Sequence, residues 1–371
     1  MRFEKKKEYK MKILTRTKSE KAWKLVESAA YEGEKELQAL LAESPSLISI
    51  QDVREGASPL VVAVREFPLP LTNSLDLLAF SANGDMTLIE CKLASNPQIK
   101  REVIGQALEY GGQLWQMSYE DLDAKIRIRA GKPLAELMRE ALGETTWDEE
   151  AFRENVESAL SEGSFILMII VDQVTDELSR IIHFVNNCGR PAFSFAALEM
   201  RRFQSETTEM LVPRVISDAR TFENPAHISA RRRWTTEMFF EDAGRKLEKE
   251  QIGIVKKLYE FTRQNASEAR MGTGAASGSF TFILLRNNNS GSIFSVFSNG
   301  DFTINFGYMD KICNRQEIET FRNQLATIPS FSEIRTTDKS YFTLKGNVAF
   351  SKPEYLEQLK EKVLEFKNSL K

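Results

Sequence analysis

Histidine is almost absent from this sequence, which has only His183 and His227 among its 371 residues. Metal sites built on several histidines are therefore excluded, and histidine-based catalysis would depend on one of these two side chains. The cysteines, Cys91, Cys188 and Cys313, are widely spaced and odd in number, so neither a disulfide framework nor a cysteine metal site is indicated. If the protein is an enzyme, carboxylates and lysines are expected to carry its chemistry.

Long apolar segments are missing as well. The longest strongly apolar run, residues 165–171, is far shorter than the ~20 residues that cross a bilayer. The first residues are charged and no apolar segment follows them, so no secretory signal is expected. We therefore predict a cytoplasmic protein without a membrane partner.

Neither sign of charge dominates the sequence, since 50 basic and 53 acidic residues give a net charge of −3. This balance argues against a uniformly basic nucleic-acid coat, although it allows local patches. Residues 1–24 contain ten basic and three acidic residues, and this arm either binds a polyanion or is a solvated terminus. The triplet Arg231, Arg232 and Arg233 is equally consistent with contacts to a phosphate backbone and with a solvated linker.

The length fits two domains better than one. Hydrophobic residues make up 42% of the chain and charged residues 28%, as in folded globular proteins. The expected parts are a basic arm at 1–24, an α/β domain at 25–218, a linker at 219–234 and an α+β domain at 235–371. The linker is placed where the regular pattern of elements breaks into polar residues.

A β-hairpin is the best-marked element of the first domain. Its two apolar runs, residues 75–81 and 86–93, flank Asn83-Gly84, and both of these residues tolerate positive φ angles. The other elements that the patterns predict are helices at 31–43, 96–115, 119–162 and 176–186 and strands at 60–65, 165–171 and 192–198.

Phenylalanines alternate along the predicted strands of the second domain. Such alternation favours one buried face of a sheet over an exposed aromatic face that stacks nucleic-acid bases. The four alternating residues are Phe280, Phe282, Phe302 and Phe306. The predicted elements are strands at 280–285, 293–298 and 302–306 and helices at 235–264, 315–327 and 353–369.

The predicted hairpin of the first domain carries charged side chains within apolar strands. Asp76 is on the first strand, and Glu90 and Lys92 are on the second. Because strand side chains alternate, Glu90 and Lys92 share a face while Cys91 points away, and the hairpin brings Asp76 beside Glu90. Two neighbouring carboxylates repel each other, and a divalent cation such as Mg²⁺ or Mn²⁺ relieves that repulsion. The alternative is an ordinary Glu–Lys pair, which the apolar surroundings disfavour.

The helix predicted after the hairpin carries Gln106 and Tyr110 on one mostly apolar stripe. Residues four apart in a helix lie on the same face, so the two side chains meet. They are either part of a site or two polar residues with partners in the core.

These parts together resemble the PD-(D/E)XK nuclease superfamily, and particularly its RecB-like branch. The matching segments are Ser-Leu-Asp-Leu-Leu around Asp76, the triplet Glu90-Cys91-Lys92, and a Q-x-x-x-Y motif from Gln106 to Tyr110. The order of these motifs on helix, hairpin and helix is more specific than any one of them. The resemblance covers about residues 25–216, and it implies a restriction-endonuclease-like mixed sheet flanked by helices.

The resemblance also implies roles for individual residues. Asp76, Glu90 and the carbonyl of Cys91 would hold Mg²⁺ or Mn²⁺, and Lys92 would position the attacking water. A glutamate on the preceding helix would orient a water on the metal ion, and the helical wheel favours Glu34 over Glu36 for this role. Gln106 and Tyr110 would contact DNA or brace the site.

The sequence thus predicts a magnesium-dependent deoxyribonuclease whose partner is DNA, with a second domain for target recognition or assembly. By resemblance, prokaryotic DNA repair or defence is a reasonable setting, and a homodimer is compatible with the sequence. The alternative is a catalytically silent nuclease-fold module that binds nucleic acid or supports assembly. A third class is a nuclease that a small ligand controls through the second domain.

Overall fold

The protein is described from a computed structural model, which shows a mixed sheet flanked by helices followed by a second, antiparallel sheet. This agrees with the predicted α/β class. The description covers residues 12–19, 21–54, 56–71, 74–96, 102–143, 147–188, 192–205, 207–217, 234–273, 277–287, 289–336 and 340–370.

Within this part of the chain the first sheet has eight strands. They lie in the order β1 (Ile13–Thr15), β2 (Lys24–Ala29), β7 (Ser194–Gln204), β6 (Ile166–Val171), β5 (Met86–Lys92), β4 (Ser74–Ser81) and β3 (Leu60–Pro68), and β8 (Glu209–Ile216) also pairs with β7. The pairs β5–β6 and β6–β7 are parallel and the others antiparallel. The central strands are therefore the parallel ones, which need cover on both faces.

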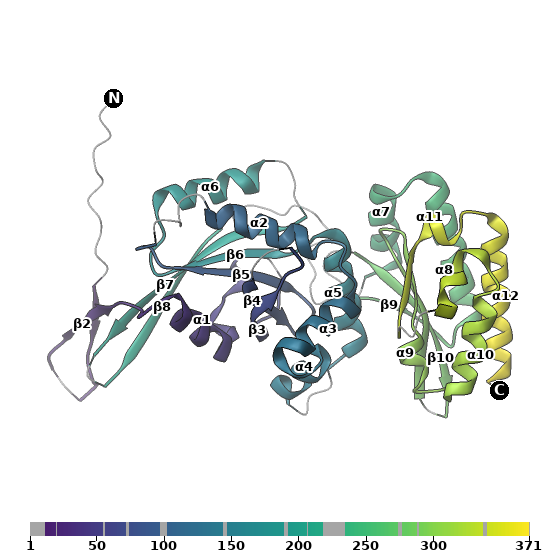
Figure 1. Ribbon diagram of the computed structural model, residues 1–371, viewed down its shortest axis with the longest axis horizontal. Helices are drawn as coiled ribbons and strands as arrows, with labels where there is room; N and C mark the ends of the chain where they lie inside the picture. The colour runs from purple at the N-terminus through teal and green to yellow at the C-terminus, as the bar shows by residue number, and fades with distance from the viewer. Residues whose placement is uncertain are drawn as a thin grey trace.

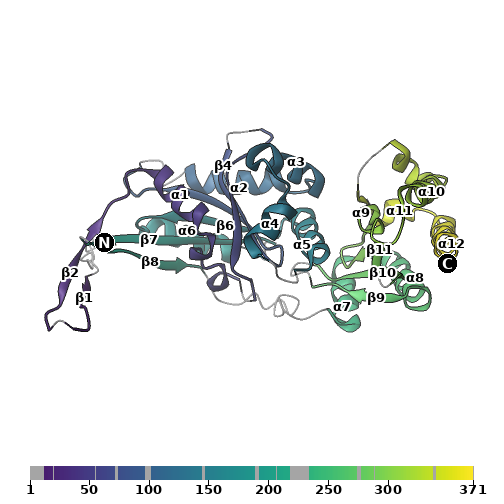
Figure 2. The ribbon, with the colours of Figure 1, turned by 90° about the horizontal axis from the view of Figure 1, so that it is seen from below.

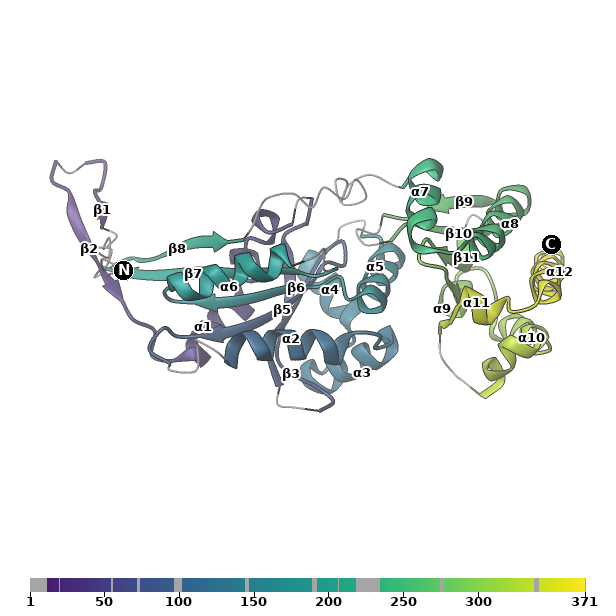
Figure 3. The ribbon, with the colours of Figure 1, turned by 90° about the horizontal axis from the view of Figure 1, so that it is seen from above.

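Helices cover both faces of this sheet (Figure 1). One face packs against α2 (Glu102–Leu114), α3 (Tyr119–Ala130), α4 (Leu134–Leu142), α5 (Glu149–Glu162) and α6 (Asp176–Asn187). The opposite face packs against α1 (Glu34–Glu43) and the 3₁₀ turns Pro45–Leu47 and Ile50–Asp52. Figure 3 shows α2 and α6 lying along the strands. Neighbouring residues on β5, such as Leu88 and Ile89, consequently belong to different cores.

The β4–β5 hairpin is present where Asn83-Gly84 predicts it. Its register pairs Leu77 with Ile89 and Phe80 with Met86. Gly84 has a φ of +85°, and a Cβ at this position would lie 2.8 Å from the carbonyl oxygen of Phe152 in α5. The turn therefore needs glycine for its backbone conformation and for the close approach of α5.

The second sheet is antiparallel throughout, in the order β13 (Phe342–Lys345), β12 (Asp301–Ile304), β11 (Asn289–Phe297), β10 (Ser279–Arg286) and β9 (Glu268–Met271). The helices of this region are α7 (Thr236–Lys246), α8 (Lys249–Asn265), α9 (Phe306–Met309), α10 (Arg315–Leu325), α11 (Gly346–Ala349) and α12 (Pro353–Ser369), with a 3₁₀ segment at Pro329–Thr336.

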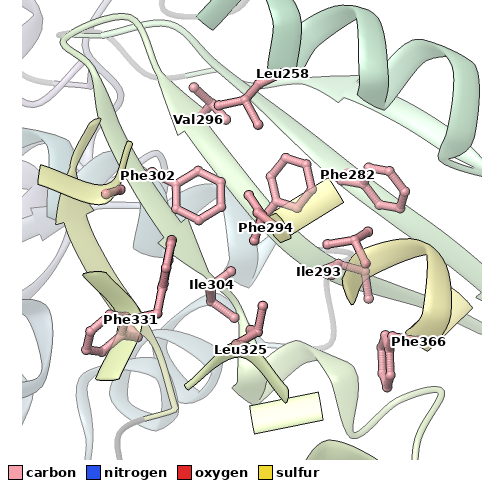
Figure 4. Packing of buried hydrophobic residues seen from close by; sticks show 14 of the residues in the cluster. Leu258, Phe282, Ile293, Phe294, Val296, Phe302, Ile304, Leu325, Phe331 and Phe366 are labelled. Atoms are coloured by element: carbon pink, nitrogen blue, oxygen red, sulfur yellow. The ribbon is translucent and has the colours of Figure 1, made fainter. Parts of the chain in front are cut away.

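One face of the second sheet is a phenylalanine-rich core, shown in Figure 4. The rings of Phe282 and Phe294 lie 5.1 Å apart, and those of Phe294 and Phe302 lie 5.3 Å apart. Phe280, Phe282, Phe302 and Phe306 are all buried. The prediction of one buried aromatic face is confirmed for Phe280, Phe282 and Phe302, whereas Phe306 begins α9 and does not belong to a strand. All four rings are buried and are therefore not available for stacking on bases.

The other face of this sheet carries hydroxyl groups and docks on α5. The register places Thr281, Ser295, Thr303 and Thr343 in one row across four strands. Ser295 and Thr281 donate hydrogen bonds of 2.7 and 3.1 Å to Glu154 of α5, and Thr343 donates one of 2.6 Å to Glu157. The two sheets are thus joined through a polar interface on α5.

Several elements differ from the sequence prediction. Part of the basic arm is strand β1, which pairs with β2. The predicted helical region 119–162 consists of three helices, and the predicted helix 235–264 consists of two, α7 and α8. The edge strands β8, β9 and β13 were not predicted. Arg231, Arg232 and Arg233 lie outside the described residues, as does most of the predicted linker, whereas the next residue, Trp234, is buried in the second core. No helix of the described part is long and apolar enough to span a membrane.

Candidate active site

The end of the β4–β5 hairpin brings Asp76 and Glu90 together. The antiparallel register that pairs Leu77 with Ile89 makes Asp76 and Glu90 the next facing pair. The Asp76 carboxylate accepts a hydrogen bond of 2.7 Å from the Cys91 amide. The Cys91 side chain itself is buried in the core beneath α1. The hairpin therefore holds the Asp76 carboxylate against the backbone of Cys91, the residue after Glu90.

Lys92 joins this pair and connects it to the start of α1. Its Nζ lies 2.9 Å from Oε1 of Glu90 and 3.7 Å from Oε2 of Glu34. The other Glu34 oxygen accepts hydrogen bonds from the Leu93 amide at 3.2 Å and the Asn96 side chain at 2.9 Å.

The neighbouring acid of α1, Glu36, points elsewhere. Its carboxylate pairs with Arg202 of β7 at 2.6 Å. Of the two candidate glutamates on α1, the structure thus brings Glu34 to the group around Lys92.

Both carboxylates of the hairpin are held where ionisation is unfavourable. Burial, and after it the negative charge of Asp76, raises the pKa of Glu90 to about 7 despite the ion pair with Lys92. Burial also raises the pKa of Asp76, against the hydrogen bonds from the Cys91 amide and the Gln38 side chain. A bound cation would offset both effects, since it stabilises the ionised carboxylates.

Lys92 is held in its charged form. Burial lowers the pKa of its ammonium group, but the ion pair with Glu90 and the charges of Glu34 and Asp76 outweigh burial, so the pKa lies above its ordinary value. In this arrangement Lys92 is a proton-bearing cation and not a general base.

Tyr110 of α2 lies against the same carboxylates. Burial and the charges of Glu90 and Asp76 raise the pKa of its hydroxyl. Gln106 lies one helical turn before Tyr110, and its Oε1 is buried without a hydrogen-bond partner among the described residues. The helix therefore places Tyr110 at the carboxylates and leaves an unused amide oxygen one turn away.

The donor set fits a cation that keeps much of its water. Oε2 of Glu90 is buried and has no hydrogen-bond partner in the described part of the chain. Among the described residues, no three His, Cys, Asp or Glu side chains form a group that could hold a metal ion. Two carboxylates and a main-chain carbonyl are enough for Mg²⁺, which usually binds through one or two carboxylates and several waters. The residues that would hold Mg²⁺ are Asp76, Glu90 and, through its carbonyl, Cys91.

Three residues at the site were not anticipated from the sequence. Gln38 lies one turn after Glu34 on α1 and hydrogen-bonds Asp76. Asn96 contacts Glu34, and Asp172 accepts a hydrogen bond of 2.6 Å from the Ala94 amide just after β5. The four-residue spacing of Glu34 and Gln38 was the one available signal, because residues so spaced share a helix face.

Arginines near this end of the sheet are bound in ion pairs. Arg201 and Arg214 pair with the buried Glu199 at 3.1 and 2.9 Å, and Arg202 pairs with Glu36 and Glu209. These arginines therefore stabilise the sheet end and the start of α1 in the structure as it stands.

Searches of this chain against protein-family models, curated proteins and solved structures found no match.

Proposed function

We propose that the protein is a metal-dependent nuclease that hydrolyses phosphodiester bonds in DNA. The observation that carries this proposal is the buried Glu90 Oε2, which has no hydrogen-bond partner among the described residues and lies beside a second, half-buried carboxylate, Asp76. An unpaired buried carboxylate oxygen is costly in a protein that has no cation to place there. The geometry therefore favours a site prepared for Mg²⁺ or Mn²⁺ over an ordinary Glu–Lys pair.

The residues around the two carboxylates suit phosphodiester hydrolysis. Bound Mg²⁺ or Mn²⁺ would supply Lewis-acid stabilisation of the phosphate and lower the pKa of the attacking water. Lys92, kept protonated by Glu90 and Glu34, stabilises negative charge that develops on the phosphate oxygens. Glu34 fixes Lys92 from the α1 side, and Tyr110 closes the site from α2.

The fold that we propose for residues 25–218 is the restriction-endonuclease-like fold of PD-(D/E)XK nucleases, in its RecB-like branch. Three features support it: the mixed sheet, the hairpin with its two carboxylates and lysine, and the helices α1 and α2 that bring Glu34 and Tyr110 to them. The second domain would then serve target recognition or assembly in prokaryotic DNA repair or defence.

A cleavage assay tests the proposal. Plasmid, linear duplex and single-stranded DNA are incubated with the protein and Mg²⁺ or Mn²⁺, with and without chelator. We expect metal-dependent cleavage of at least one substrate. Lys92→Ala should slow it by about 100-fold or more, the range seen when one transition-state donor is lost. Lys35→Ala removes an exposed lysine next to Glu34 and should leave the rate unchanged.

Two results would contradict the proposal. If DNA is bound but stays intact with every metal, the catalytic proposal is wrong and the protein is a binding module on the same fold. Cleavage by Lys92→Ala at the wild-type rate would mean that another site carries the reaction.

A further inference from the structure

A ribbon formed by β1 and β2 projects from one end of the first domain. Figure 2 shows it extending beyond the rest of the domain, at the end opposite the second sheet. Three residue pairs join the two strands, from Ile13–Val26 to Thr15–Lys24. A two-stranded ribbon of this length has little stability of its own.

The ribbon is basic and carries exposed apolar groups. Residues 12–24 contain five basic residues and one acidic residue. Lys12, Arg16, Lys18 and Lys21 are all exposed. Trp23 is 59% exposed, and the Arg16 guanidinium lies 4.8 Å from the centre of its ring. This concentration of positive charge on a projecting element fits a polyanionic partner.

A groove runs between this ribbon and the β7–β8 hairpin, and its lining is rich in hydroxyl groups. The hydroxyl-bearing residues that line it are Thr15, Thr17, Ser28, Ser205, Thr207 and Thr208. Arg16 and Lys24 line it as well, and among the described residues Glu27 is the one carboxylate in the lining. Hydroxyl groups and basic side chains are the usual protein partners of phosphate oxygens in DNA complexes.

The groove is connected to α1, the helix whose first residue is Glu34. Ala29, the last residue of β2 and part of the groove lining, pairs with Arg202 of β7. Arg202 in turn forms an ion pair with Glu36, two residues after Glu34. Along β2 the ribbon leads away from this point over about 17 Å, at ~3.3 Å per residue. That length corresponds to about five base pairs of DNA at ~3.4 Å each.

We infer that the β1–β2 ribbon and its groove bind the phosphate backbone of duplex DNA beside the cleavage site. DNA is taken as the partner because it is the substrate of the proposed nuclease, so the inference rests on that proposed function. The ribbon would hold about five base pairs on one side of the scissile bond and fix the direction in which the duplex crosses the site.

The salt dependence of binding tests the inference directly. Binding of a labelled 30-base-pair duplex is measured by fluorescence anisotropy in chelator, where no cleavage occurs, over a range of KCl concentrations. The arm variant is R16Q/K18Q/K21Q. The matched control is K249Q/K257Q/R263Q, which removes three exposed charges from α8 in the second domain. Thermal melting confirms that both variants are folded.

Each phosphate contact contributes about 0.9 to the slope of log K against log salt. If all three arm residues contact phosphates, the slope of log K against log salt should be shallower by about 2.7 for the arm variant than for the wild type. The control should have the slope of the wild type. Between 50 and 200 mM KCl the wild type would then lose about 40-fold more affinity than the arm variant. Equal slopes for the arm variant and the control would overturn the inference.

Two further outcomes separate the ribbon from the nuclease. If the arm variant changes the slope but the wild type does not cut the same duplex with Mg²⁺ or Mn²⁺, the proposed nuclease fails and the ribbon assignment stands. If the wild type cuts and the slopes are equal, the nuclease stands and the ribbon assignment fails. Tighter, arm-dependent binding of duplex RNA would overturn the assignment to DNA.

Discussion

Replacing Glu90 by glutamine should stabilise the metal-free protein above neutral pH. The glutamine resembles the protonated carboxyl group in size and charge, so it removes the cost of holding an ionised carboxylate beside Asp76. Burial and that neighbouring charge raise the pKa of Glu90 from 4.5 to about 7 in the folded protein. Because the folded state binds the proton more tightly than the unfolded state, Glu90 destabilises the fold increasingly as pH rises from about 4.5 to 7.

The size of the effect follows from linkage. At about 1.4 kcal/mol per pH unit, Glu90→Gln should stabilise the chelated protein by about 3 kcal/mol at pH 8 and by about 1 kcal/mol at pH 5. For a domain of this size, the pH 8 gain corresponds to a rise of about 6–12 °C in Tm. Substitutions that remove a functional group from an active site often stabilise the protein at the expense of its activity.

Thermal melting in chelator and in Mg²⁺ checks this prediction. The wild type should melt at a higher temperature in Mg²⁺, and Glu90→Gln should show little response to it. The reasoning is refuted if Glu90→Gln lowers Tm at pH 8 in chelator. It is also refuted if the gain is the same at pH 5 and pH 8.

Three other predictions concern the fold. Burial raises the pKa of Glu154 to about 7, so Glu154→Gln should stabilise the protein in urea unfolding, followed by tryptophan fluorescence, by more at pH 8 than at pH 5, and an equal gain at both pH values would contradict this. Gly84→Ala should cost at least about 2 kcal/mol in urea unfolding, because of its positive φ and its contact with α5, whereas Gly112→Ala on the open face of α2 should not destabilise. Phe282→Ala should cost about 3–5 kcal/mol by the same measurement, and a loss below 1 kcal/mol would contradict the packing described for the second core.

The sequence predicts the hairpin and its charged residues well because the controlling signals are local. Asn83-Gly84 sets the turn, and alternation along β5 decides that Glu90 and Lys92 share a face while Cys91 does not. The position of Glu34 on the start of α1 could be anticipated from the helical wheel, since Leu37 and Leu41 fix the buried side.

Contacts that depend on distant segments could not be predicted in this way. Asp172 reaches the Ala94 amide because β6 lies parallel to β5, and nothing in either local sequence specifies that neighbour. The four-residue edge strands β9 and β13 are too short to give a clear period.

The docking of α5 on the second sheet also depends on distant segments and could not be predicted from the local sequence. Alternation of phenylalanine with serine and threonine predicts one buried face of the second sheet. It does not reveal that the hydroxyl face is covered as well, because Glu154 and Glu157 come from more than a hundred residues away.

The most direct test of the proposed active site is a single-turnover cleavage assay on a labelled DNA duplex at increasing Mg²⁺ concentration. The wild type and Glu43→Gln, which changes an exposed carboxylate at the end of α1, should cut with a rate that saturates with Mg²⁺. Glu90→Gln should remain folded and cut at no Mg²⁺ concentration tested. Cleavage by Glu90→Gln with the rate and Mg²⁺ dependence of the wild type would contradict the account.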